Sequence, residues 1–188
     1  MSLHDDPPFD LGQTLGVSSD ADGKGWVGAV KVFTDVNPRT GRVRSNRLKR
    51  CVAVRNTSGV ALLPKKLVKF ADGSVSAVDA YTRLDNAVVA GVVDEYLPST
   101  GVADDDVFWV TVEGPTEVSL GAASAAAINA DIVALTAAAV AATDGATGGR
   151  AQTASVTTAA QVLGYVGRAM SAGAAGADIL VHAGLVRS

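Results

Sequence analysis

The residues best suited to metal or nucleophilic chemistry are few and lie far apart in this sequence. His4 and His182, the two histidines, stand near opposite ends of the 188-residue chain. A metal site needs several His, Cys or carboxylate ligands at clustered spacing, so we expect none here. Cys51 follows Arg50, and a neighbouring cation lowers the pKa of a thiol and favours the nucleophilic thiolate. No catalytic signature surrounds it, and a buried strand cysteine is the simpler interpretation.

Carboxylates and glycines are plentiful, but their spacing does not match a known reaction. Asp104, Asp105 and Asp106 are consecutive, which is typical of a turn and makes a poor acid–base pair. The glycine-rich stretches GATGG and SAGAAG lack the lysine of a phosphate-binding loop and the strand-to-helix setting of a dinucleotide fingerprint. We therefore expect no cofactor, no small-molecule substrate and no enzymatic activity.

Positive charge is concentrated in one segment. Residues 39–69 contain ten Lys or Arg and no Asp or Glu, although the whole chain has a net charge of −3. Such a segment could follow the phosphates of a nucleic acid, but it contains no aromatic residue for base stacking before Phe70. The same cations could instead meet an acidic protein surface. We predict that the partner-binding side chains are those of Arg42, Arg44, Arg47, Lys49 and Arg50, joined by Phe9 and Leu11.

The elements that must position these residues are short strands. Residues 1–25 hold two prolines, four glycines and five aspartates without a sustained apolar period, so we expect an extended N-terminal arm before a single domain at 26–188. Turn residues then separate eight to ten apolar stretches at roughly ten-residue spacing. This pattern predicts an all-β sandwich or barrel. The clearest strand is DDDVFWVTVEGP, in which both alternating faces are apolar, as in a buried central strand.

The Ala-rich region 120–142 is ambiguous. Ile128, Ile132 and Leu135 lie at helical spacing, and alanine is the best helix former, so periodicity favours a helix. The segment DIVALTA also fits a short strand bounded by turns. This region contains Asn129 and Asp131 and is too weakly hydrophobic to span a bilayer, so we expect a soluble protein without a membrane partner. The single cysteine suits a reducing compartment.

Two parts of the chain resemble the head decoration (cement) proteins of tailed bacteriophages. These are VVAGVVDEYLP with VADDDVFWVTVEGP, and the terminal VGRAMSAGAAGADILVHAGL, where Gly167, Arg168 and Ala169 match a Gly-Arg-Ala strand pattern. The resemblance covers about the last hundred residues, and the N-terminal arm and basic segment have no counterpart in it.

The resemblance implies a small β-rich virion protein on the outer surface of an icosahedral capsid. Such a protein would bind across major capsid protein subunits and stabilise the shell, either as a trimer or as another homo-oligomer. It also favours a strand at DIVALTA. Two other hypotheses remain open: another phage structural role in the neck or tail, and a nucleic-acid-binding barrel that uses residues 39–69.

Overall fold

The computed structural model describes residues 7–16, 26–71, 74, 77–80, 89–122, 124–134, 150–153 and 165–184. These residues form an all-β fold that contains no helix, and hence none with the length and apolarity needed to cross a membrane. The strands are β1 (Val30–Val36), β2 (Val43–Asn56), β3 (Leu67–Phe70), β4 (Ala77–Ala80), β5 (Val89–Val93), β6 (Val107–Ser119), β7 (Asp131–Ala134), β8 (Ala151–Thr153), β9 (Tyr165–Ala169) and β10 (Asp178–Gly184).

Five of the strands close into a ring. β2 pairs with β4 in parallel, and the antiparallel pairs β4–β3, β3–β5, β5–β6 and β6–β2 complete the circle. Closure leaves these strands without free hydrogen-bonding edges along their paired lengths. The prediction of an all-β sandwich or barrel is therefore confirmed.

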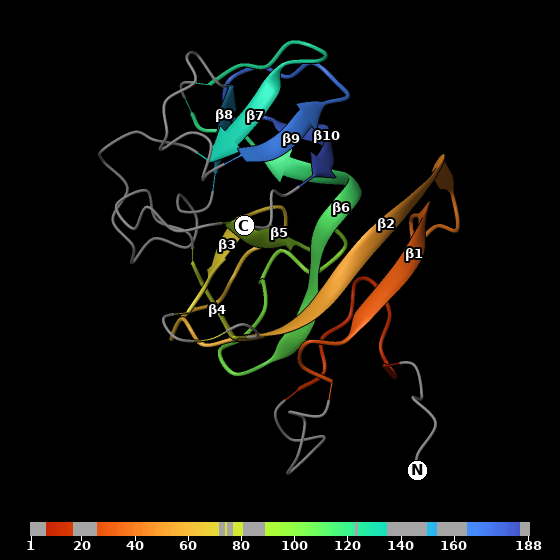
Figure 1. Cartoon of the computed structure of the whole chain (residues 1–188), viewed down its shortest axis with the longest axis vertical. Coiled ribbons are helices and arrows are strands. Elements are labelled where there is room, and N and C mark those ends of the chain that lie inside the picture. Colours follow the sequence, from red (N-terminus) through yellow and green to blue (C-terminus); the bar gives the residue numbers. More distant parts are fainter. Residues whose placement is uncertain are drawn as a thin grey trace.

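A second layer extends from the end of β6. The first half of β6 pairs with β2 as far as Glu113, and the second half pairs with β10, which is followed by β9, β7 and β8. Figure 1 shows these last strands stacked above the barrel. Gly114 marks the change of partner: it has a φ of +96°, and a Cβ there would lie 2.3 Å from the Leu48 carbonyl oxygen. Only glycine allows the two backbones to come this close.

Three apolar clusters hold the layers together. The barrel interior contains Phe108 and Val110 of β6, whereas Trp109, the residue between them, belongs to a cluster on the outside of the barrel. A third cluster, which includes Leu67, Val118 and Ile179, joins the barrel to the second layer. Because successive side chains of β6 enter different clusters, both faces of this strand are buried, as its sequence predicts.

Residues 7–16, here called the strap, cover the outer cluster. The Phe9 ring stacks on the Trp109 ring with centroids 4.7 Å apart, and the Trp109 Nε1 donates a hydrogen bond of 3.2 Å to the Phe9 carbonyl. Leu15 exchanges backbone hydrogen bonds of 2.8 and 3.1 Å with Val107. Leu11 is also buried. This part of the predicted arm therefore folds back onto its own domain, while residues 1–6 and 17–25 lie outside the described residues.

The ambiguous Ala-rich region contains a strand where the structure describes it. Asp131–Ala134 form β7, which pairs with β8 and β9, so the helix favoured by periodicity is wrong for these residues. Alanine has a high helix propensity, but tertiary pairing of Ile132 and Val133 in a buried sheet outweighs it. Leu135 and the residues up to 149 lie outside the described part.

Candidate partner-binding surface

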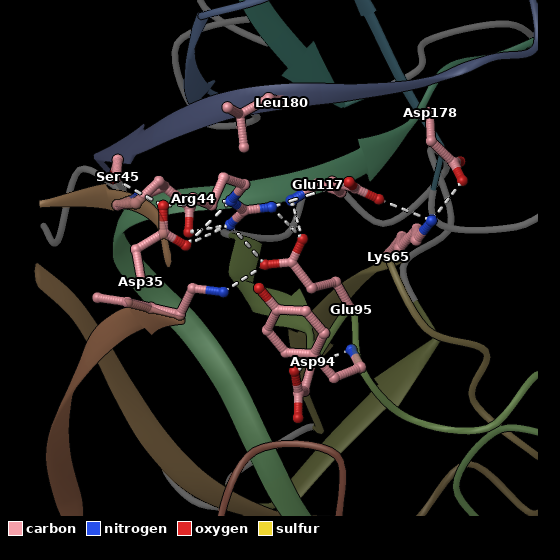
Figure 2. Close-up of polar contacts among 12 residues, drawn as sticks. Asp35, Arg44, Ser45, Lys65, Asp94, Glu95, Glu117, Asp178 and Leu180 are labelled. Atoms are coloured by element: carbon pink, nitrogen blue, oxygen red, sulfur yellow. Dashed lines mark hydrogen bonds and ion pairs between the residues drawn. The ribbon is translucent and has the colours of Figure 1, made fainter. Parts of the chain in front are cut away.

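Arg44 and Lys49 of the basic segment form ion pairs with buried carboxylates. The guanidinium of Arg44 lies between two carboxylates, with Nη2 2.7 Å from Asp35 Oδ1 and Nη1 2.6 Å from Glu95 Oε2 (Figure 2). Both carboxylates are almost fully buried, and Ser45 Oγ donates to Asp35 at 2.7 Å. Arg44 therefore serves as an internal tie between the β1–β2 hairpin and the end of β5.

Lys49 is the most deeply buried cation among the described residues. Its side chain is 0 % exposed, and its ammonium donates to Glu95 and lies 5.1 Å from the centre of the Tyr96 ring. An ammonium removed from water is costly unless it is paired, so the Glu95 carboxylate is required at this position. Glu95 accepts hydrogen bonds from Lys49, from Arg44 and from the backbone N–H of Glu117.

The ionic network continues towards the second layer of the sheet. The Lys65 ammonium lies 2.7 Å from a carboxylate oxygen of Glu117 on β6 and 2.7 Å from one of Asp178 on β10 (Figure 2). Ser119 Oγ also donates to Asp178 at 2.7 Å. These groups are partly exposed, so water weakens their attraction. They link the turn before β3 to the two strands that leave the barrel.

The charged groups of this network satisfy one another. Although burial alone lowers the pKa of Arg44, its hydrogen bonds to Glu95 and Asp35 raise that pKa above the usual value. Desolvation raises the pKa of Cys51 to about 12 despite the nearby Lys49 ammonium, which leaves a neutral thiol. Across the described ranges, no group of three or more His, Cys, Asp or Glu side chains has an arrangement that could hold a metal ion.

The β1–β2 hairpin presents a very different surface on its other side. Val32 stands opposite Arg50, Thr34 opposite Leu48, and Val30 opposite Val52. Val30, Val32 and Leu48 are 49, 54 and 61 % exposed, which is unusual for large apolar side chains. The name outer hairpin face is used here for Val30, Val32, Leu48 and Arg50. Its side chains alternate with Phe33, Lys49 and Cys51, which point to the covered side.

The remaining candidate cations lie on the same hairpin and are exposed. Among the residues that the structure describes, the ion pair of Arg50 is a long contact of 4.0 Å with the well-exposed Glu113. Arg42 precedes Val43, which is itself 63 % exposed, and Arg47 precedes Leu48. The structure therefore brings Arg42, Arg47 and Arg50 together with exposed valine and leucine side chains on one hairpin. Apolar residues mixed with arginine are typical of the central part of a protein interface.

Four of the seven predicted partner-binding residues make contacts within their own chain. Phe9 and Leu11, which belong to the strap, are buried, and Lys49 is buried against Glu95. Arg44 is half-buried and bound to Asp35 and Glu95. In each case the side chain is already packed or ion-paired within its own chain.

Sequence reasoning missed the carboxylates that organise this region. Asp94 accepts hydrogen bonds from the backbone N–H of Gly12 at 2.5 Å and of Tyr96 at 3.1 Å, and so holds the strap to the end of β5. Burial raises the pKa of Asp94, although these two hydrogen bonds lower it. The sequence did contain a signal for these carboxylates: the pair Asp94–Glu95 directly follows the apolar run VVAGVV. Acidic side chains next to a buried strand must either be paired inside the protein or reach the solvent.

Comparisons with known proteins do not identify a family for this chain. No protein-family model matches it, and no curated protein matches its sequence. The assignment of a function therefore rests on the chemistry of its surface and on the resemblance described above.

Proposed function

We propose that this chain is a structural protein of a bacteriophage virion, bound to the outer surface of an icosahedral capsid across major capsid protein subunits. The single observation that carries the binding role is the outer hairpin face, where Val30, Val32 and Leu48 are exposed beside arginine side chains. The capsid as the partner is supported by the resemblance of the β5–β6 and β9–β10 segments to decoration proteins.

The physical chemistry of the described residues supports a role in attachment. The buried charged groups form ion pairs that hold the fold together. The exposed apolar side chains of the outer hairpin face do not take part in these ion pairs. A repeated weak contact, made by many copies on a symmetric shell, gives a large total stabilisation. An oligomer, for example a trimer, would multiply the contacts of each bound unit.

The direct test is to mix the purified protein with capsids that lack it. We expect saturable, stoichiometric binding and a higher temperature for release of packaged DNA. Leu48→Asp, which places a charge on the outer hairpin face, should weaken binding at least about tenfold, given the energy of one buried leucine. Ile128→Asp is the matched control, because Ile128 is equally exposed but lies outside the hairpin.

An absence of capsid binding at salt concentrations that keep the shell intact would overturn this proposal. The competing nucleic-acid hypothesis predicts a gel shift at low salt that disappears steeply as salt is added. Two of the cations that the nucleic-acid hypothesis needs, Arg44 and Lys49, are neutralised by Asp35 and Glu95. We expect no specific shift.

A further inference from the structure

β1 has a free hydrogen-bonding edge in the described part of the chain. It stands first in the strand order and pairs only with β2. The Ala53 N–H donates to the Ala29 carbonyl at 2.9 Å, and hydrogen-bonded positions alternate along an antiparallel pair. The backbone groups of Lys31 and Phe33 therefore point towards β2. Those of Val30, Val32 and Thr34 point away from it, where a further strand could bind.

The side chains beside this edge indicate what kind of strand would fit. Val30 and Val32 project from β1 on the exposed side, and Arg50 lies beside Val32 on β2. Arg42 and Arg47 add positive charge to the same hairpin. An added strand would place alternate side chains on this exposed side. Apolar side chains would cover the valines, and carboxylates would pair with the arginines.

A second copy of this chain is a poor occupant of the same edge. Pairing of two β1 strands would bring together two hairpins that each carry the exposed Arg42, Arg47 and Arg50. Within one chain, Arg50 makes a contact of 4.0 Å with the exposed carboxylate of Glu113. Like charges brought close together at an interface are destabilising. The charge of the hairpin therefore favours a partner that is acidic.

We propose that β1 binds an extended acidic segment of the partner protein by strand addition. The segment runs along the edge at Val30, Val32 and Thr34 and carries apolar and carboxylate side chains. This proposal rests on the proposed function, in that the segment is assigned to the major capsid protein. Strand addition uses main-chain hydrogen bonds for affinity and side chains for selectivity.

The test uses two substitutions at one position. Val32→Pro removes the outward N–H and leaves the β1–β2 hydrogen bonds in place, which an edge strand tolerates. Val32→Thr keeps that N–H and is the matched control. The probe is a labelled synthetic peptide of alternating valine and glutamate, about the length of the seven-residue β1 strand. Fluorescence anisotropy measures binding, and thermal unfolding shows that both variants are folded.

We expect the wild-type chain and Val32→Thr to bind the peptide with similar affinity, and Val32→Pro to bind at least about tenfold more weakly, since it loses a hydrogen bond and fits the added strand poorly. A peptide of alternating valine and lysine should bind least. Equal binding by Val32→Pro and Val32→Thr would overturn strand addition. Equal binding of the two peptides would overturn the acidic partner.

A second variant keeps the test decisive if Val32→Pro does not fold. Arg50→Glu reverses one exposed charge and should weaken the glutamate peptide while strengthening the lysine peptide. No change in this preference would contradict the proposal.

The same variants, tested on capsids, separate this inference from the proposed function. Capsid binding that Val32→Pro leaves unchanged would refute strand addition to the capsid and keep the decoration role. Peptide binding as expected, with no capsid binding by the wild-type chain, would refute the decoration role and keep the edge site for another acidic partner.

Discussion

The two sides of the β1–β2 hairpin use the same basic segment in opposite ways. On the covered side, Lys49 and Arg44 are bound by Glu95 and Asp35 and help to hold the fold together. On the exposed side, Arg50 lies among valine and leucine side chains and has only a long contact with Glu113. The basic segment therefore contains two kinds of cation: Arg44 and Lys49 stabilise the fold, and Arg50 is exposed on a surface suited to binding.

The pKa shifts on the covered side have a structural origin. Groups with shifted pKa values are concentrated at functional sites in many proteins, but structural ion pairs shift pKa values as well. Here the shifts of Arg44 and Asp94 arise from burial and from contacts that hold the β1–β2 hairpin and the strap to the end of β5. On the other side of the hairpin, Val30, Val32, Leu48 and Arg50 are exposed.

The largest expected effect is on the covered side. Lys49→Ala leaves Glu95 buried without one of its cations and should lower the free energy of unfolding by about 3–5 kcal/mol. Arg47→Ala, on an exposed residue of the same strand, should change it by less than about 0.5 kcal/mol. Urea unfolding followed by far-UV circular dichroism measures both. Similar losses for the two variants would remove the distinction between the covered and exposed sides.

Removal of the ring that fastens the strap should have the next largest effect. Phe9→Ala deletes the partner stacked on Trp109 and should lower the free energy of unfolding by about 3 kcal/mol. Phe70→Ala is the control, because Phe70 is 37 % exposed. Limited proteolysis should cut the Phe9 variant first near the strap. A strap that is equally protected in both proteins would show that Phe9 does not anchor it.

The partly exposed end of the network should give the smallest effect and a characteristic pH dependence. Burial alone would raise the pKa of Asp178, but the hydrogen bonds from Lys65 and Ser119 lower it. This stabilisation is present above the ordinary Asp pKa and is lost as the pH falls through the lowered value. Asp178→Asn should therefore cost less than about 1 kcal/mol at neutral pH and flatten the acid side of the stability profile.

Glu113→Gln is the control for this experiment, because Glu113 is 65 % exposed and makes only a long contact. Its acid profile should follow that of the wild-type chain. Identical acid profiles for Asp178→Asn and the wild-type chain would show that the Lys65–Asp178 pair does not contribute to stability.

Much of the local structure could be predicted because the causes are local. The alternation in VFWVTVEGP, with apolar residues on both faces, predicts the buried strand β6, and turn residues separate the strands before and after it. Asp104 and Asp105 lie in a turn, as their consecutive spacing suggests. The helix favoured at 128–135 was wrong at β7, because helical spacing in an Ala-rich stretch does not reveal the neighbouring strands β8 and β9.

The sequence by itself determined that the chain is built of strands and that its positive charge is concentrated in one segment. Only the tertiary structure decided that β2 closes a ring with β6, that the strap returns to Trp109, and that Lys49 is internal while Arg50 is exposed. The reason is physical. Alternation along a strand separates two sides, but which side is covered depends on segments such as Asp94–Glu95 that are distant in the chain and meet it only after folding.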